Sequence, residues 1–382
     1  MAENKDEKVL NVPHLRFPEF SGEWEKKRFK DVCNITTGNK NTQDKSDDGI
    51  YPFYVRSQNV ERINSWTFDG EAILTAGDGV GVGKVFHYST GKIGVHQRVY
   101  ILSDFKCDGK YLYSYFAGNF YNRVKRMSAK NSVDSVRMEM IADMPISLPS
   151  TMEQKKIGHL LALLDERIAT QNKIIEKLES LIKGLNDSLY KRYDDSIRTT
   201  FAKLGYSYSG LSGKSAEDFG TGKPFITYLN VYSNNVVNEN DYQYVRIGEG
   251  EKQNVVQYGD VLFTLSSETP EEVGIGTVYL GHDEVYLNSF CFGIHIVNEK
   301  QAYPPYLSYY VSSTPFRKFI YPFAQGSTRF NLCKADFERA SITLPSLDNQ
   351  KRIYSVLNSI TMKISICLLY TSPSPRDKRQ SR

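Results

Sequence analysis

Two short segments of this sequence look like chemical motifs, and each lacks a residue that the chemistry requires. The run from Gly77 to Lys84 resembles a phosphate loop, but Asp78 stands where the motif needs its first glycine. Val85 stands where Ser or Thr would bind magnesium. The run also falls between two expected strands rather than before a helix, so a glycine-rich hairpin is predicted.

Tyr303-Pro-Pro-Tyr306 resembles the motif with which amino-methyltransferases hold a target amine. Its first position offers no side-chain carbonyl or carboxylate, and no Rossmann-type glycine fingerprint accompanies it, so the segment is predicted to open a helix. No Ser–His–Asp or Cys–His arrangement is recognisable, and the five cysteines and six histidines show no metal-ligand spacing. The sequence therefore predicts no catalytic residue, no metal and no cofactor in this chain.

Side chains that suit nucleic-acid recognition gather in loops. Arg, Asn, Gln, Ser and Thr read base edges, while Lys and Arg hold phosphates. The candidates in the first half are Arg56, Ser57, Gln58, Asn59, Lys84, His96, Gln97, Arg98, Lys130, Asn131 and Ser132. Those in the second half are Thr227, Tyr228, Asn230, Ser266, Ser267, Asn288, Ser289, Gln325, Ser327, Thr328 and Arg329. Any one of them could be an ordinary solvated residue, but their clustering at matched positions favours a binding surface for double-stranded DNA.

These loops belong to two halves that repeat the same order of segments. Ile342–Ser346 echoes Ile146–Ser150, and Gln350–Ile353 echoes Gln154–Ile157, both at an offset of 196 residues. The framework segments match while the intervening loops differ, which predicts a tandem duplication of one unit, a globular domain followed by a helix. Short strands between glycine turns, among them one at Val82–Tyr88, with a helix near 111–127, predict an α+β fold. The expected divisions are 1–150, 151–195, 196–346, 347–366 and 367–382.

A long amphipathic helix at about 153–193 connects the two globular domains. Its narrow apolar seam repeats every seven residues, as in a coiled coil, and indicates that a second helix packs against it. The seam comprises Ile157, Leu161, Leu164, Ile168, Ile175, Leu178, Ile182, Leu185 and Leu189. The second copy repeats the pattern in the same heptad register with Ile353, Leu357, Ile360 and Ile364. The two helices are therefore predicted to pair with each other.

Composition places few limits on the partners. The net charge of +4 neither requires nor excludes nucleic acid. The N-terminus lacks an apolar signal region and no run approaches 18 apolar residues, so neither a secretion signal nor a membrane span is expected, and the cytoplasm is the predicted location. Pro373 and Pro375 cannot continue the second helix, and residues 367–382 are expected to be non-native sequence.

The two strand-to-helix junctions and the order domain–helix–domain–helix resemble the specificity (S) subunits of type I restriction–modification systems. The segment Gly210–Phe219, followed by Phe225–Asn230, also looks like the opening of a target recognition domain in that family. The resemblance covers residues 15–366. It implies two target recognition domains that read the halves of an interrupted DNA site, and two antiparallel helices that set their spacing.

The resemblance further implies partners that carry the chemistry. Two methyltransferase (M) subunits would bind S-adenosylmethionine and methylate adenine, and a restriction (R) subunit would use ATP and Mg to translocate and cleave DNA. Two alternatives stay open: the recognition part of a fused methyltransferase–nuclease, and a coiled-coil scaffold that binds protein rather than DNA.

Overall fold

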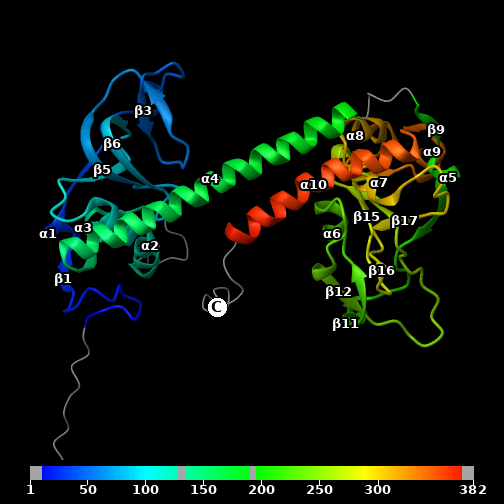
Figure 1. Cartoon of the computed structure of the whole chain (residues 1–382), viewed down its shortest axis with the longest axis horizontal. Helices are drawn as coiled ribbons and strands as arrows, with labels where there is room; N and C mark the ends of the chain where they lie inside the picture. Colours follow the sequence, from blue (N-terminus) through cyan, green and yellow to red (C-terminus); the bar gives the residue numbers. More distant parts are fainter. Residues whose placement is uncertain (1–10, 128–134, 190–194, 372–382) are drawn as a thin grey trace, which may run out of the picture. The chain divides into compact units, whose positions relative to one another are not determined.

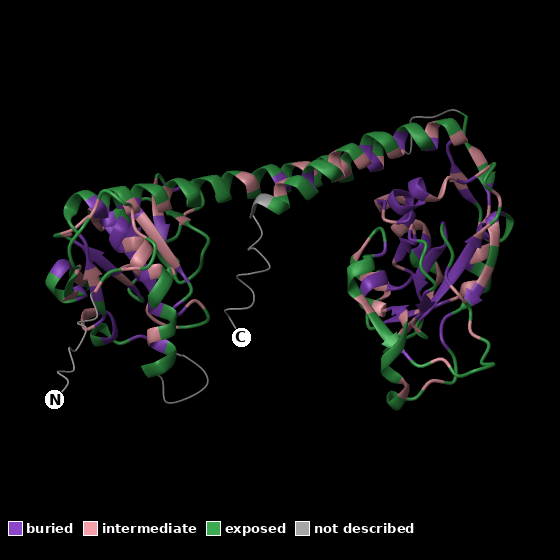
Figure 2. Cartoon of the chain, turned by 60° about the horizontal axis from the view of Figure 1, so that its bottom comes forward, coloured by how far each residue is buried: buried purple, intermediate pink, exposed green. Residues whose placement is uncertain are grey.

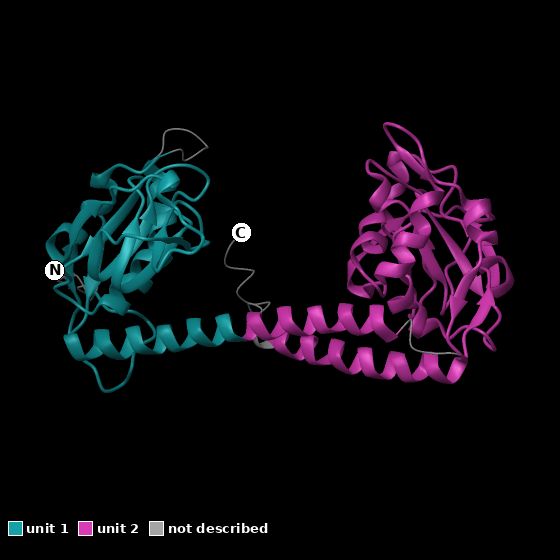
Figure 3. Cartoon of the chain, turned by 90° about the horizontal axis from the view of Figure 1, so that it is seen from above, with its two compact units in different colours: residues 1–170 teal, residues 171–382 magenta. Residues whose placement is uncertain are grey.

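The chain divides into two compact units, residues 1–170 (unit 1) and 171–382 (unit 2), which Figure 3 colours separately. The computed structural model describes residues 11–127, 135–189 and 195–371. The boundary falls inside the 39-residue helix α4 (Thr151–Leu189), so the first part of this helix belongs to unit 1 and the rest to unit 2.

Unit 1 is built on a six-stranded sheet with the order β2-β7-β5-β6-β3-β4. Only β3 and β6 pair in parallel; the other neighbours are antiparallel. The strands are β1 (Glu25–Arg28), β2 (Asn34–Thr37), β3 (Tyr51–Tyr54), β4 (Glu61–Ile63), β5 (Phe68–Ala76), β6 (Phe86–Val95), β7 (Val99–Ser103) and β8 (Pro145–Leu148). The helices before α4 are α1 (Phe29–Val32), α2 (Gly109–Met127) and α3 (Met138–Ala142).

Helix α2 covers this sheet with one apolar stripe. Leu112, Phe116, Phe120 and Val124 recur every fourth residue and are fully buried. The ring of Phe86 on β6 meets that of Phe116 edge-on, with 5.5 Å between ring centres. Each such side chain contributes about 1.5–3 kcal/mol by leaving water, which fixes α2 on the sheet.

Unit 2 repeats this topology. Its sheet β10-β17-β13-β15 corresponds to β2-β7-β5-β6, and a second sheet, β12-β11-β16, contains the parallel pair β11–β16 that corresponds to β3–β6. Where unit 1 has the single long strand β6, unit 2 has the separate strands β15 and β16, so one sheet becomes two. The predicted duplication and α+β class are confirmed.

The strands and helices of unit 2 are labelled in Figure 1. Its strands are β9 (Ile197–Thr199), β10 (Gly205–Ser209), β11 (Phe219–Ile226), β12 (Tyr242–Val245), β13 (Val261–Thr264), β14 (Ser266–Ser267), β15 (Gly276–Val278), β16 (Tyr286–Leu287), β17 (Cys291–Ile296), β18 (Ala324–Gln325), β19 (Phe330–Leu332) and β20 (Ile342–Leu344). Its helices are α5 (Phe201–Leu204), α6 (Tyr228–Ser233), α7 (Pro304–Tyr310), α8 (Thr314–Ile320), α9 (Lys334–Arg339) and α10 (Leu347–Thr371).

Each unit is closed by a pair of strands from its two ends. In unit 1, β1 pairs with β8 and sets Glu25 opposite Leu148; in unit 2, β9 pairs with β20 and sets Ile197 opposite Leu344. Both pairs are antiparallel. The chain therefore enters and leaves the globular part of each unit at neighbouring strands.

A buried glutamine holds each strand-to-helix junction. The amide of Gln154 donates to the carbonyl of Pro149 at 2.8 Å and accepts from the backbone N–H of Asp108 at 3.0 Å. Gln350 does the same with Pro345 at 2.9 Å and Tyr303 at 2.8 Å. The glutamine of the repeated junction thus ties the start of the long helix to the segment that precedes α2 or α7.

The second part of α4 and helix α10 lie side by side in unit 2, in opposite chain directions (Figures 1 and 3). The predicted seam residues that pack in the core of unit 2 are Ile182, Leu185, Leu189, Ile353 and Leu357. Ile175 and Ile364 are buried, while Leu178 and Ile360 are half-buried. The amide of Asn186 adds a hydrogen bond of 2.7 Å to the carbonyl of Tyr309.

The first part of α4 differs. There Ile157 packs on the core of unit 1 and Leu161 is half-buried, but Leu164 and Ile168 are exposed. Figure 2 shows much of this helix in the colours of exposed and half-buried residues. The helix pairing expected for Leu164 and Ile168 stays a prediction.

Three expectations about elements need adjustment. The strand expected at Val82–Tyr88 begins only at Phe86, because Gly79 and Gly83 adopt positive φ angles of 78° and 67° in a turn. Helix α10 continues to Thr371, beyond the expected end at 366, while residues 372–382 lie outside the described part. Residues 347–369 of α10, with a mean hydropathy of 1.2, are also long and apolar enough to cross a membrane, although no such segment was expected. One such helix is weak evidence, because it rests on length and composition alone.

Candidate nucleic-acid interface

A tight turn before β7 carries three of the predicted residues in unit 1. His96 donates its backbone N–H to the carbonyl of Tyr54 at 3.0 Å and accepts at its own carbonyl from Val99 at 2.9 Å. Its ring Nδ1 accepts the backbone N–H of Arg98 at 3.0 Å. The side chain of His96 therefore holds the turn, and Arg98 stands at its tip.

The corresponding turn before β17 has the same hydrogen bonds. Asn288 donates to Ile226 at 3.0 Å and accepts from Cys291 at 3.0 Å, and its Oδ1 accepts the backbone N–H of Phe290 at 2.9 Å. The carbonyl of the tip residue is bound in both units, Arg98 by Gly77 at 2.8 Å and Phe290 by Leu265 at 2.9 Å. Arg98 and Phe290 therefore occupy equivalent positions.

An open cavity of about 550 Å³ lies beside the turn of unit 1 and is lined by Arg56, Ser57, His96 and the glycine-rich loop after β5. Asp78 of that loop accepts a hydrogen bond of 2.9 Å from Arg56 and lies 3.7 Å from the Nε of Arg98. Both guanidinium groups are exposed. One carboxylate therefore aligns two arginine side chains whose guanidinium groups face the solvent.

Burial lowers the pKa of His96, and the nearby guanidinium groups of Arg56 and Arg98 lower it further, against the opposite effect of Asp78. The ring is therefore neutral at neutral pH. A neutral ring can leave Nδ1 free to accept from Arg98, whereas a doubly protonated ring cannot. His96 itself is almost completely buried, so its role is to position Arg98 and not to contact a ligand directly.

The remaining predicted residues of unit 1 are dispersed around this turn. Gln58 and Asn59 are exposed after β3, Gln97 donates to Asn41 at 2.7 Å, and the ammonium of Lys84 lies 5.7 Å from the ring centre of Tyr121. The predicted residues Lys130, Asn131 and Ser132 lie outside the described residues.

In unit 2, four of the predicted residues line a cavity of about 330 Å³. The lining includes Tyr228, Ser266, Ser267 and Arg329, and the guanidinium carbon of Arg329 lies 5.7 Å from the ring centre of Phe290. The other predicted residues nearby are Thr227, which caps α6, Asn288 and Ser289 on the turn, and Gln325, Ser327 and Thr328, which are exposed around the β18–β19 connection.

Asn230 was predicted to contact DNA, but the structure favours a role in packing. Its side chain is fully buried and donates to the carbonyl of Asn238 at 2.9 Å, while its Oδ1 accepts the backbone N–H of the same residue at 2.9 Å. These bonds hold α6 against the segment that follows it.

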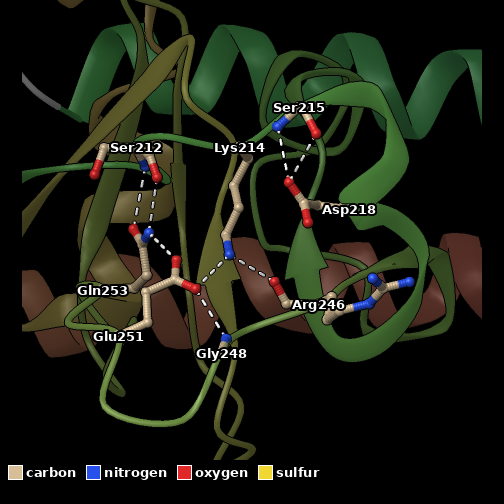
Figure 4. A network of polar contacts seen from close by, with 8 residues as sticks. All are labelled: Ser212, Lys214, Ser215, Asp218, Arg246, Gly248, Glu251 and Gln253. Atoms are coloured by element: carbon tan, nitrogen blue, oxygen red, sulfur yellow. Dashed lines mark hydrogen bonds and ion pairs between the residues drawn. The ribbon is translucent and has the colours of Figure 1, made fainter.

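The segment Gly210–Phe219 is held by a network of polar contacts within unit 2 (Figure 4). The ammonium of Lys214, whose side chain is 8% exposed, donates to the carbonyl of Arg246 and to Glu251, both at 2.6 Å. This ion pair, with hydrogen bonds from Gln253 and Gly248, lowers the pKa of Glu251 to about 2. Lys214 is therefore engaged inside the unit and unavailable to hold a phosphate.

Sequence reasoning missed the apolar members of the site in unit 2. Phe290 is 55% exposed and Leu229 is 68% exposed, and both line the cavity. Glu272 was also missed; hydrogen bonds from Tyr232 and Ser267 lower its pKa and keep it ionised. Aligning His96-Gln97-Arg98 with Asn288-Ser289-Phe290 would have pointed to Phe290. Within the described ranges, no group of His, Cys, Asp and Glu could hold a metal ion.

Comparison with known proteins shows which family the chain belongs to. The family described as "Type I restriction modification DNA specificity domain" matches residues 21–180 and again 212–367. The specificity subunit of the type I restriction enzyme MjaVIII of Methanocaldococcus jannaschii is 24% identical over 95% of this chain and 91% of its own length. That of EcoDI of Escherichia coli is 27% identical over 44% of this chain, and the match spans only 37% of the EcoDI subunit.

A solved structure shares the fold. The S subunit of the type I restriction–modification system from M. genitalium superposes with a TM-score of 0.62 at 14% identity, over 90% of this chain and 91% of that one. With two family matches that together cover most of the sequence, this chain belongs to the type I restriction–modification DNA specificity family.

Proposed function

We propose that this chain is the non-catalytic, DNA-reading subunit of a type I restriction–modification complex. Unit 1 reads one half of an interrupted double-stranded site and unit 2 reads the other, with α4 as the spacer. M subunits dock on the helices and an R subunit joins them in the cytoplasm. S-adenosylmethionine, ATP and Mg belong to those partners.

The observation that carries the proposal is the pair of equivalent turns. Both units use the same hydrogen bonds to hold a turn, yet its tip is Arg98 in one and Phe290 in the other. Predicted residues line the cavity beside each turn, Arg56 and Ser57 in unit 1 and Tyr228 and Arg329 in unit 2. A constant frame with different exposed side chains suits two readers of different sequences, because base edges are distinguished by side-chain chemistry.

The test is methylome sequencing of a host that carries this chain with its M subunit. N6-methyladenine should appear at one motif made of two half-sites and a gap of fixed length. No motif, or a contiguous one, would contradict the proposal.

The methylation pattern, a DNA-binding assay and the gene context together separate the alternatives. A protein-binding scaffold would leave the methylation pattern unchanged, and the full chain with M would show no DNA binding at low salt. A fused enzyme would be revealed by a catalytic domain encoded in frame upstream.

A further inference from the structure

We infer that Phe290 is a specificity-determining residue of unit 2 and that it contacts the methyl group of a thymine in the major groove. The inference rests on the proposed function and adds a residue and a base to it. It starts from the equivalence of Phe290 with Arg98, whose side chain is of the type that binds guanine O6 and N7.

The backbone around Phe290 is held in place. Its N–H binds Asn288 Oδ1 at 2.9 Å and its carbonyl binds the N–H of Leu265 at 2.9 Å. Neither bond depends on the ring. The aromatic side chain is therefore not needed to form the turn. Its exposure of 55% leaves the ring accessible to a ligand.

The surroundings of the ring favour a base edge over a phosphate. Glu268 and Glu272 line the same cavity, and Glu272 is held in its ionised form by Tyr232 and Ser267. Two carboxylates repel the phosphate backbone, whereas a carboxylate can accept a hydrogen bond from an exocyclic amino group of a base.

The ring also lies in an apolar setting that suits a methyl group. Leu229 is 68% exposed and lines the cavity with Phe290. Arg329 lies over the ring at 5.7 Å, a cation–π distance, and brings a donor to the same place. Apolar contact with the C5-methyl group distinguishes thymine from the other bases in the major groove, and phenylalanine is one of the side chains that make it.

The experiment uses the full chain with its M subunit and duplexes selected from a randomised library. The half-site of unit 2 is the one that changes when residues 200–345 are exchanged for those of a relative. Each thymine of that half-site is then replaced singly by deoxyuridine, which lacks only the methyl group. At one position the wild-type Kd should rise about three- to fivefold, the loss expected for one buried methyl group.

The variant Phe290→Ala should raise the Kd by a similar factor on the thymine duplex and show no further loss on the deoxyuridine duplex. Phe290→Leu, which keeps an apolar side chain, should retain part of the preference. Tyr258→Ala is the matched control, because Tyr258 is also an exposed aromatic residue of unit 2, stacked on His282 near the opposite end of β13.

The outcomes distinguish this inference from the proposed function. If the wild-type complex selects no sequence, the proposed function fails. If it selects a site but Phe290→Ala remains as sensitive to deoxyuridine as the wild type, or no thymine methyl group matters, the inference about Phe290 is overturned. Equal melting temperatures of the variant and the wild type would show that unfolding is not the cause of any change.

Discussion

Asp78 determines how the two arginines of unit 1 are presented. Its carboxylate binds Arg56 at 2.9 Å and lies 3.7 Å from Arg98. A carboxylate beside two exposed guanidinium groups orients them and also reduces their attraction for phosphates. It therefore favours selective over non-selective binding.

Replacing Asp78 by Asn should tighten binding to non-specific DNA and weaken discrimination at the unit 1 half-site. The salt dependence of log Kd should steepen by about one, because one more cation becomes free to pair with a phosphate. Binding titrations at several salt concentrations measure this. Asp69→Asn removes the same charge from an exposed position near the other end of β5 and should change neither quantity. Equal effects of the two variants would refute a special role for Asp78.

The histidine of the turn in unit 1 should make stability depend on pH. The pKa of His96 is lowered by burial and by Arg56, so below about pH 7 the unfolded chain takes up a proton that the folded turn resists. Stability contributed by this residue is thus present at neutral pH and is lost as the pH falls.

His96→Asn copies the residue that holds the turn in unit 2 and removes the titrating group. The melting temperature of the variant should fall less than that of the wild type between about pH 7 and pH 5. Thermal melts at several pH values test this. Parallel profiles for the two proteins would show that His96 does not contribute to the pH dependence of stability.

At the scale of elements, the two glutamines explain why the strand-to-helix junctions repeat so closely. Gln350 is fully buried and its amide satisfies three backbone groups, those of Pro345, Tyr303 and Gln301. An apolar side chain of similar length would leave these groups buried without partners. Such a loss costs about 1–3 kcal/mol per group.

A loss of about 1 kcal/mol lowers the melting temperature of a domain of this size by about 2–4 °C. With three backbone groups left without partners, Gln350→Leu should therefore lower the melting temperature of unit 2 by about 6 °C or more. Calorimetry of the full chain measures the change. Arg352→Gln is the control, since Arg352 is exposed on the same turn of α10. If Gln350→Leu melted like the control, the hydrogen bonds of the junction would contribute nothing to stability.

The repeat and the long helix could be predicted because periodicity and matched spacing are properties of the sequence alone. The heptad pattern led to α4, and the shared junctions led to the duplicated units. The strand that begins at Phe86 was predicted to begin at Val82, because the sequence alone does not show the positive φ angles of Gly79 and Gly83, which are set by the fold. Phe290 was missed because an aromatic residue in a sequence is usually buried. The side chain of Asn230 is of a type that reads bases, yet it packs inside unit 2.

At the scale of the whole molecule, the two units have separate cores and the same topology. The chain enters and leaves the globular part of unit 2, residues 197–344, through β9 and β20, which are neighbours. A unit built in this way can be exchanged without threading the chain through the rest. The loops that differ between the two repeats lie within each unit.

Replacing residues 200–345 with the same segment of another family member should change one half-site and preserve the other half-site and the gap. The seam residues Ile182, Leu185 and Leu357 are retained, so the core of the incoming segment must pack against them. Methylome sequencing of the host gives the new motif. If both half-sites changed, the units would not read independently.

The closing strand pairs also determine how each unit responds to mechanical load. Because Glu25 lies opposite Leu148, a pull on the two ends of unit 1 acts on the β1–β8 ladder from the end where the chain enters and leaves. The hydrogen bonds then break one after another, as in unzipping, and do not share the load. Unit 2 has the same geometry at Ile197 and Leu344. Tension applied at these strand ends would thus open the closing strands before it loads the central sheets.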